Sequence, residues 1–254
     1  MAAPSLAPLW GRRVVLSRLG IQGARVRIRA FAQGGDDLPR LRGGRGAGLE
    51  VRIERLTVER SELLLEHARV PLDLDLPRFR GRLSARRTGG LEGTLAFGPG
   101  AARFGGGPAL PVATTMDVIL DGRALTVTSA HLTAKGTDLA YNGRLRFETP
   151  PQGAFALSGR VDLDTLDRHV LRTDFGLGGV GVFDGRLGIT GSRFRLDGTM
   201  EGGEGACKGV PVPRFAGRVR WSEAGLELRG LDVETLGGHA TLDIDVPRGR
   251  GVAR

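Results

Sequence analysis

Apolar and polar residues alternate in short stretches along almost the whole chain. In "ARVRIRA" (24–30), Val26 and Ile28 share one side and the arginines take the other, which is the period-two pattern of a half-buried strand. Gly-rich and polar segments that favour turns separate the stretches. The pattern predicts a meander of many strands, each about 5–8 residues long. Further strands are predicted at 49–53, 70–76, 81–85, 91–97, 153–163, 184–189, 192–198, 217–221 and 240–246.

One arrangement of strands recurs at 51–76, 125–147 and 226–246. In each copy an apolar pair two residues apart is followed, after a slip in the alternation, by a second such pair. A polar or glycine turn and another strand come next, as in "LTVTSAHLTAKGTDLAYNGRLRF" (125–147). The recurrence predicts an irregular repeat of hairpin units.

Helical spacing of apolar residues is found at 163–172, "LDTLDRHVLR", where Leu163, Leu166 and Val170 fall on one face. One short helix cannot cover the apolar face of so many strands. That face must therefore meet a second sheet, close on itself by curling, or be covered by a ligand. Because aromatic residues make up only 5% of the chain, we expect a mostly aliphatic lining, which suits acyl chains better than a polar substrate.

The chain divides in this interpretation into three parts. Residues 1–12 are expected to be a poorly ordered start, 13–172 a first β-groove segment that ends in the helix 163–172, and 173–254 a second, truncated β-groove segment. The segment "GLGGVG" (176–181) matches the letters of a dinucleotide-binding motif. It follows the helix and leads into a strand, whereas that motif follows a strand and opens a helix, so we predict a flexible connector.

The formal charge of +9 raises the question of nucleic-acid binding. Only Lys135 and Lys208 among the 37 basic residues are lysines, and the arginines are spread along outward strand positions. No aromatic platform for bases is interleaved with them, so a solvated face is the better interpretation. The single cysteine, Cys207, excludes an intrachain disulfide and lies in what the glycines around it predict to be a turn. No stretch approaches the roughly 18–20 apolar residues of a membrane-spanning helix.

Candidate chemistry is sparse. The histidines His67, His131, His169 and His239 are isolated in the sequence, without the spacing of a metal site. Aspartates are paired two apart at 73/75, 162/164 and 243/245, a spacing that a glycosidase or a divalent metal could use. Each pair lies opposite the apolar set of its own strand, where plain alternation places charge. No serine-hydrolase elbow or P-loop occurs, and we predict no enzyme and no cofactor.

Several segments resemble the AsmA-like and TamB-like families, the latter named for the translocation and assembly module. The resemblance lies in residues 11–41, 51–83, 136–147 and 237–246. It implies an all-β, elongated, curled antiparallel meander with an apolar concave face, in a periplasmic protein anchored in the inner membrane of a diderm bacterium. It also implies phospholipid transport between the two membranes, or translocation and assembly of outer-membrane proteins with an outer-membrane β-barrel partner. The chain would be an N-terminal-side fragment, with its anchor and the partner-binding region outside it.

The resulting hypothesis is a conduit whose groove solvates phospholipid acyl chains, each buried CH₂ contributing roughly 0.8 kcal/mol. Two alternatives remain open: a structural β-sandwich interaction module without lipid cargo, and a carbohydrate-active β-helix enzyme that uses one aspartate pair. Neither nucleic acid nor a metal is expected as a partner. The predicted groove-lining residues are Val26, Ile28, Val51, Ile53, Leu125, Val127, Leu132, Leu145 and Phe147.

Overall fold

The protein is almost entirely β-sheet in the computed structural model, which describes residues 13–30, 50–67, 72–104, 106–148, 150–172, 175–191 and 193–247. The predicted start at 1–12 lies outside the described residues. The strands are β1 (Arg13–Leu16), β2 (Leu19–Gln22), β3 (Arg25–Ala30), β4 (Glu50–Ile53), β5 (Arg55–His67), β6 (Leu72–Ala85), β7 (Leu91–Phe104), β8 (Leu110–Asp121), β9 (Ala124–Ala134), β10 (Thr137–Arg146), β11 (Gln152–Asp162), β12 (Leu177–Thr190), β13 (Arg193–Cys207), β14 (Val210–Ser222), β15 (Gly225–Thr235) and β16 (Gly238–Pro247).

One 14-stranded sheet contains all but two of these strands. From β5 to β16 each strand pairs antiparallel with the next in the sequence, which confirms the predicted all-β meander. The first strands depart from it: β2 and β3 both pair with β5 in parallel, and β1 pairs with β4 in a separate two-stranded parallel sheet. The repeating hairpin pattern therefore organises the chain from β5 onward.

The strands β5–β16 are longer than predicted, from 10 residues in β10 to 15 in β13. The sequence pattern breaks where a strand continues through an irregularity. In β6 the described part of the predicted strand 70–76 and the predicted strand 81–85 form one strand, which continues through Pro77 and through Arg78, whose φ is 63°. A bulged strand bends without ending, so two short alternating stretches can form one long strand.

The slip in the repeated units is a β-bulge in two of the three copies. In β9 the register against β8 shifts between Asp117 and Val118, which keeps Leu125 and Leu132 on one face. The register between β15 and β16 likewise shifts between Leu228 and Leu231. Without the extra residue, the one-residue slip would turn the second apolar pair toward the opposite face. In the first copy the break separates β4 from β5, which belong to different sheets.

Two local predictions were wrong. The segment 176–181 is not a connector, because β12 begins at Leu177. A Cβ on Gly179 would lie only 2.8 Å from the Cα of Gly205 in β13, so glycine there permits close strand contact in a bulged pair. Cys207 does not lie in a turn but ends β13, opposite Leu177, and its thiol donates to the carbonyl of Phe175 at 3.4 Å.

A short helical segment follows β11, as the sequence predicted for 163–172. It consists of α1 (Leu163–Leu166) and a wider turn, η2 (Asp167–Leu171), and ends at Arg172 in the left-handed conformation. The Asp162 carboxylate caps it by accepting from the backbone N–H of Thr165 at 2.7 Å. The helical segment lies between β11 and β12 in the sequence but does not interrupt the sheet, because these two strands pair directly with each other.

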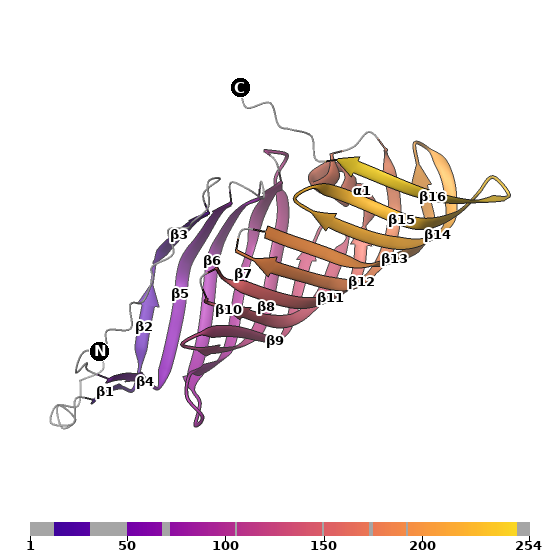
Figure 1. Cartoon of the computed structure of the whole chain (residues 1–254). Coiled ribbons are helices and arrows are strands. Elements are labelled where there is room, and N and C mark those ends of the chain that lie inside the picture. Colours follow the sequence, from indigo (N-terminus) through magenta and orange to yellow (C-terminus); the bar gives the residue numbers. More distant parts are fainter. Residues whose placement is uncertain are drawn as a thin grey trace.

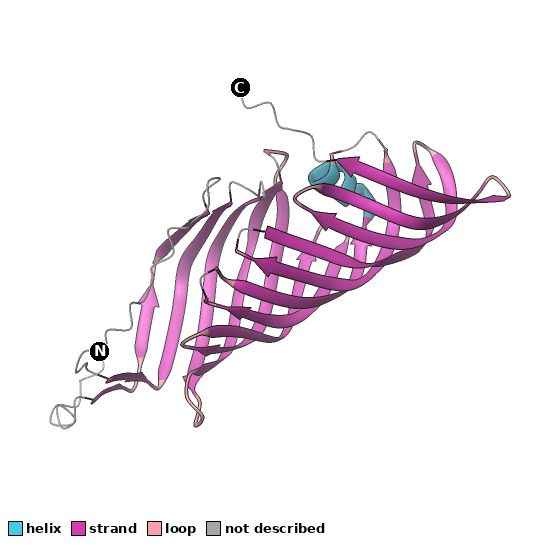
Figure 2. Ribbon diagram, viewed as in Figure 1, coloured by secondary structure: helices cyan, strands magenta, loops and turns pink. Residues whose placement is uncertain are grey.

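The sheet twists and curls around its apolar face, and the helix lies inside the curl near one end (Figures 1 and 2). Two core clusters form on this concave face. The first core cluster contains Leu83, Val118, Val127 and Ala130 from β6, β8 and β9. The second contains Phe183, Val219 and Leu226 from β12, β14 and β15.

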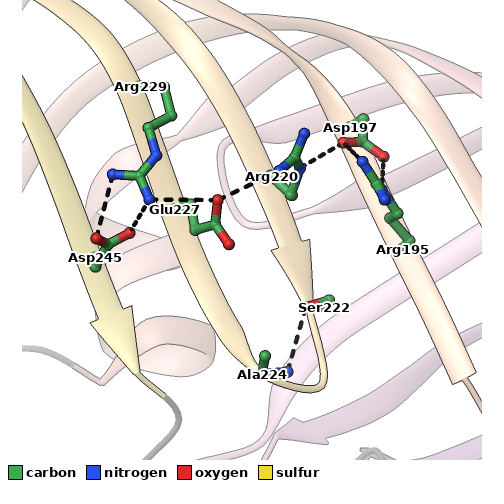
Figure 3. Close-up of polar contacts among 8 residues, drawn as sticks. All are labelled: Arg195, Asp197, Arg220, Ser222, Ala224, Glu227, Arg229 and Asp245. Carbon is green, nitrogen blue, oxygen red and sulfur yellow. Dashed lines mark hydrogen bonds and ion pairs between the residues drawn. The ribbon is translucent and has the colours of Figure 1, made fainter.

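The convex face carries the charged side chains that alternate with the apolar ones along each strand. Across β13–β16, a charge ladder of Arg195, Asp197, Arg220, Glu227, Arg229 and Asp245 joins four strands side by side (Figure 3). Its closest contacts are Arg195–Asp197 at 2.5 Å and Arg229–Asp245 at 2.6 Å. At the other end of the sheet, Arg25 pairs with Glu62 and both Arg27 and Arg29 pair with Glu66. Many of these charges thus stabilise strand pairing on a solvated surface.

Candidate functional site: an apolar groove in the curled sheet

A groove of about 580 Å³ lies on the concave face, and the three residues of the second core cluster are part of its lining. This volume falls within the range of sites that bind small molecules. Figure 1 shows α1 near one end of the curled sheet. Side chains from strands β6 to β15 and from α1 and η2 line the groove. Its aliphatic residues include Leu74, Leu76, Leu110, Val112, Leu132, Leu139, Leu157, Val161, Leu187 and Leu196, joined by Leu166, Val170 and Leu171 of the helical segment.

The lining is mostly aliphatic, as expected, but aromatic side chains are more frequent in it than in the chain as a whole. Those that line it are Phe97, Phe104, Tyr141, Phe183, Phe194 and Trp221. They are few in the chain as a whole, but the curl brings them together from β7, β10 and β12–β14. Composition therefore underestimated the aromatic share of this surface, because it takes no account of which side of each strand a residue occupies.

Two contacts, Phe104 with Trp221 and His169 with Pro108, join opposite walls of the groove. Phe104 at the end of β7 meets Trp221 of β14 with ring centroids 6.5 Å apart, although these strands are far apart in the sheet order. Phe194 packs edge-on against the same indole at 5.2 Å. The His169 Nδ1–H donates to the carbonyl of Pro108, in the β7–β8 connection, at 3.2 Å. The helical segment is thus held against the wall across from the strands that carry it.

Partly buried hydrogen bonds fix the position of the helical segment. The Asp162 cap bonds Thr165, and the backbone N–H of Asp162 donates to Thr137 Oγ1 at 3.1 Å. Asp167, only 3% exposed, accepts from the backbone N–H of Leu177 at 3.0 Å. These bonds attach the helical segment to β10 and β12, so the groove end that it forms is built on the sheet.

Hydroxyl groups are the main polar feature of the lining. Thr114 donates to the carbonyl of His131 at 2.8 Å, and Tyr141 lies 3.0 Å from the same threonine oxygen. Burial raises the pKa of Tyr141, against the opposing effect of its hydrogen bond with Thr114, so the phenol is neutral at pH 7. Thr137 accepts from Asp162. Thr165 differs: it is 4% exposed, and its Oγ1 has no hydrogen-bond partner among the described residues.

The residues predicted to line the groove occupy different places. Leu132 lines it, while Leu125 and Val127 pack in the first core cluster. Leu145 pairs across from Leu125 on the same face. Phe147 is 50% and Val26 46% exposed, and Ile53 lies in the small sheet of β1 and β4. The side chains of Ile28 and Val51 lie outside the described residues.

Most of the lining was missed because alternation assigns a residue to a face but does not say which part of that face stays open. Val112, Leu139 and Leu157 each alternate as clearly as the predicted residues do. What distinguishes them is their position where the curl keeps the opposite walls apart, which depends on the twist of the whole sheet.

The aspartate pairs have structural partners where their contacts are described. Asp162 caps the helix and Asp164 pairs with Arg168 at 2.7 Å. Asp243 accepts from the backbone N–H of Gly230 at 2.8 Å, and Asp245 belongs to the charge ladder. Over the described ranges, no group of three or more His, Cys, Asp or Glu side chains is placed to hold a metal ion.

Comparison of the chain with protein-family models, with curated proteins and with solved structures found no match. In the part of the chain that the structure describes, no helix is long and apolar enough to cross a membrane. The groove is therefore interpreted from its own residues.

Proposed function

We propose that the groove binds the acyl chains of phospholipid and that the chain is a segment of a periplasmic conduit through which phospholipid moves between the inner and outer membranes. The observation that carries this proposal is a groove of about 580 Å³ lined almost throughout by apolar side chains. Burying acyl chains there removes apolar surface of both ligand and protein from water, which is favourable without any directed contact. Transport of this kind needs no catalytic group.

A polypeptide is a poorer match for the lining. An unfolded outer-membrane protein would bring backbone N–H and C=O groups into the groove, and each of them needs a hydrogen-bond partner. The hydroxyls of Thr114, Thr137 and Tyr141 are already engaged within the protein, and the fourth hydroxyl of the lining, on Thr165, is buried. A lipid tail has no such requirement, which favours lipid over protein as the cargo of this segment.

The test is the lipid content of the purified chain. We expect phospholipid to co-purify with the chain from a bacterial lysate that contains membranes. Mass spectrometry after solvent extraction should detect it. Val112→Asp places a charge in the groove and should lower the bound phospholipid at least fivefold. Val182→Asp makes the same change on the outward side of β12, where the valine is 49% exposed, and should leave the lipid unchanged.

Absence of phospholipid from the unaltered chain would contradict the proposal and favour the structural module, in which the apolar faces only bury one another. Recovery of unfolded outer-membrane protein in place of lipid, lost in Val112→Asp, would instead assign the groove to polypeptide cargo.

A further inference from the structure

Two hollows in the sheet surface lie where β-bulges interrupt the pairing of strands. One, of about 520 Å³, borders the irregular register of β5 and β6 between Val58 and Ser61. The other, of about 570 Å³, borders the register shifts of β14 and β16 against β15, next to Gly217 and Gly230. Because a bulge leaves an extra residue unpaired and bends its strand, both hollows have the same structural origin. They differ in the charges that surround them.

The hollow between β5 and β6 opens on the convex face. Its lining includes Arg80, Gly81 and Arg82. A Cβ on Gly81 would lie 2.9 Å from the side chain of Leu95, which packs against the first core cluster on the concave face. Because neighbouring residues of a strand point to opposite faces, Arg80 and Arg82 point to the convex side. The hollow is therefore separate from the apolar groove, which lies on the other face of the sheet.

This hollow, which we call the arginine hollow, has an excess of positive charge. Its lining contains four guanidinium groups and one carboxylate, on Glu59, which gives a formal charge of +3. Within the part of the chain that the structure describes, none of the four guanidiniums has a hydrogen-bond or ion-pair partner. The four arginines, all exposed, are Arg60, Arg78, Arg80 and Arg82.

The other hollow shows that this excess does not come with every bulge. Its two arginines, Arg218 and Arg229, are balanced by Glu201 and Asp232. Arg229 also pairs with Asp245 at 2.6 Å. An anion would meet as many negative as positive charges there, so this balanced hollow is a matched comparison for the arginine hollow.

The chemistry of the arginine hollow selects a phosphate group as its ligand. A guanidinium binds phosphate oxygens through two parallel N–H bonds, which a lysine cannot provide. A carboxylate would bring one charge and two oxygens. A terminal phosphate brings up to two charges and three free oxygens, so it can bind several guanidiniums at once and offset most of the excess charge.

We propose that the arginine hollow binds a phosphate group, carried either by a lipid headgroup or by a free phosphate compound. The site lies on the opposite face of the sheet from the groove, and its occupation does not depend on the proposed function. It gives the convex face a specific ligand where the other described arginine clusters bind the protein's own carboxylates, as Arg25 and Arg27 do.

The experiment measures two kinds of binding. Isothermal titration calorimetry follows inorganic phosphate, and co-sedimentation follows vesicles of phosphatidylcholine with and without phosphatidic acid. We expect Arg78→Gln/Arg80→Gln to weaken binding of the phosphate-bearing probe at least about tenfold, because it removes charge-assisted hydrogen bonds. Arg214→Gln/Arg218→Gln removes the same charge from exposed positions of β14 and should weaken binding less than about twofold, since distant charges are screened.

A second pair of substitutions keeps the test decisive if one variant does not fold. Arg60→Gln/Arg82→Gln changes the other two arginines of the hollow, one on each strand, and should give a similar loss. Phospholipid bound in the groove should be the same in all these variants, because none of the substituted residues lines it.

The outcomes identify the source of the phosphate or overturn the site. Binding of inorganic phosphate alone assigns the site to a soluble compound, and binding only of vesicles with phosphatidic acid assigns it to a lipid headgroup. Binding of both shows that the phosphate group itself is recognised. Binding of neither overturns the proposal. Equal losses in the β14 variant and the arginine-hollow variants also overturn it, because the net charge of +9 would then explain the binding.

Discussion

Val112 and Val118 lie six residues apart on the same face of β8 and end up in different environments. Val118 is 2% exposed and packs in the first core cluster against residues of β6 and β9. Val112 is half-buried and lines the groove. One strand with a single alternation therefore contributes both to a closed core and to an open cavity. The difference arises from the curl of the sheet, which brings the walls together at one end of β8 and holds them apart at the other.

This comparison separates two roles of an apolar face that look identical in sequence. In the first core cluster the apolar side chains are buried by protein, so their burial supports folding directly. In the groove part of the apolar surface stays open, with the aromatic contact of Phe104 and Trp221 joining the walls. Open apolar surface of this kind is typical of interaction and ligand-binding sites, which is the basis of the proposed function.

The largest effect is expected for Val118→Asp. A carboxylate in the first core cluster has neither solvent nor a cation beside it, and an unpaired buried charge costs about 3–5 kcal/mol. We expect the free energy of unfolding, measured with urea, to fall by about that amount. The matched substitution Val182→Asp on the convex side should change it by less than about 0.5 kcal/mol. Equal losses for the two variants would show that the first cluster is not the stabilising core.

Val112→Asp should destabilise the protein less than Val118→Asp, although both replace a valine of β8 by aspartate. The carboxylate can reach water through the open groove, so we expect a loss of about 1–2 kcal/mol in the same urea experiment. Bound phospholipid should fall sharply at the same time. If Val112→Asp costs as much stability as Val118→Asp, the groove is closed in solution and the contrast along β8 disappears.

The sequence was sufficient for the parts of the fold that depend on local pattern. Alternation predicted the meander, and the spacing of Leu163, Leu166 and Val170 predicted the helix. The slip between the second copy's two apolar pairs was interpreted as a break between two strands, whereas it is a bulge within β9. Strand lengths were not predicted, because a slip in the alternation looks the same at a bulge as at the end of a strand. The parallel pairing of β2 and β3 was not predicted, because non-local pairing leaves no local signal. The lining of the groove depends on the curl of the whole sheet, which explains why Leu132 alone among the predicted residues with described side chains is found there.

Asp162→Ala tests how the groove end is held. The substitution removes the cap of α1 and should lower the free energy of unfolding by about 1 kcal/mol. Asp164→Ala, in the same predicted acid pair, removes only the contact with Arg168 at 2.7 Å and should cost less than about 0.5 kcal/mol. Thermal or urea unfolding of both variants checks the difference. Similar effects of the two substitutions would argue that the acids act as a pair.

The convex face offers the smallest contrast, because its charges remain in water. The guanidinium of Arg195, with help from Arg220, holds the pKa of Asp197 below its usual 3.8, against a smaller effect of burial that raises it. A carboxyl whose pKa is lower in the folded protein adds stability above pH 3.8, and that contribution is lost as the pH falls through the lowered value. Asp197→Asn should therefore lower Tm slightly at pH 7, by less than Asp162→Ala does, and the difference from the unaltered chain should vanish in strong acid. High salt should reduce it as well. A lower Tm of Asp197→Asn that persists in acid and in high salt would mean that Asp197 stabilises the protein through packing. The convex face would then contribute to stability in the same way as the concave face.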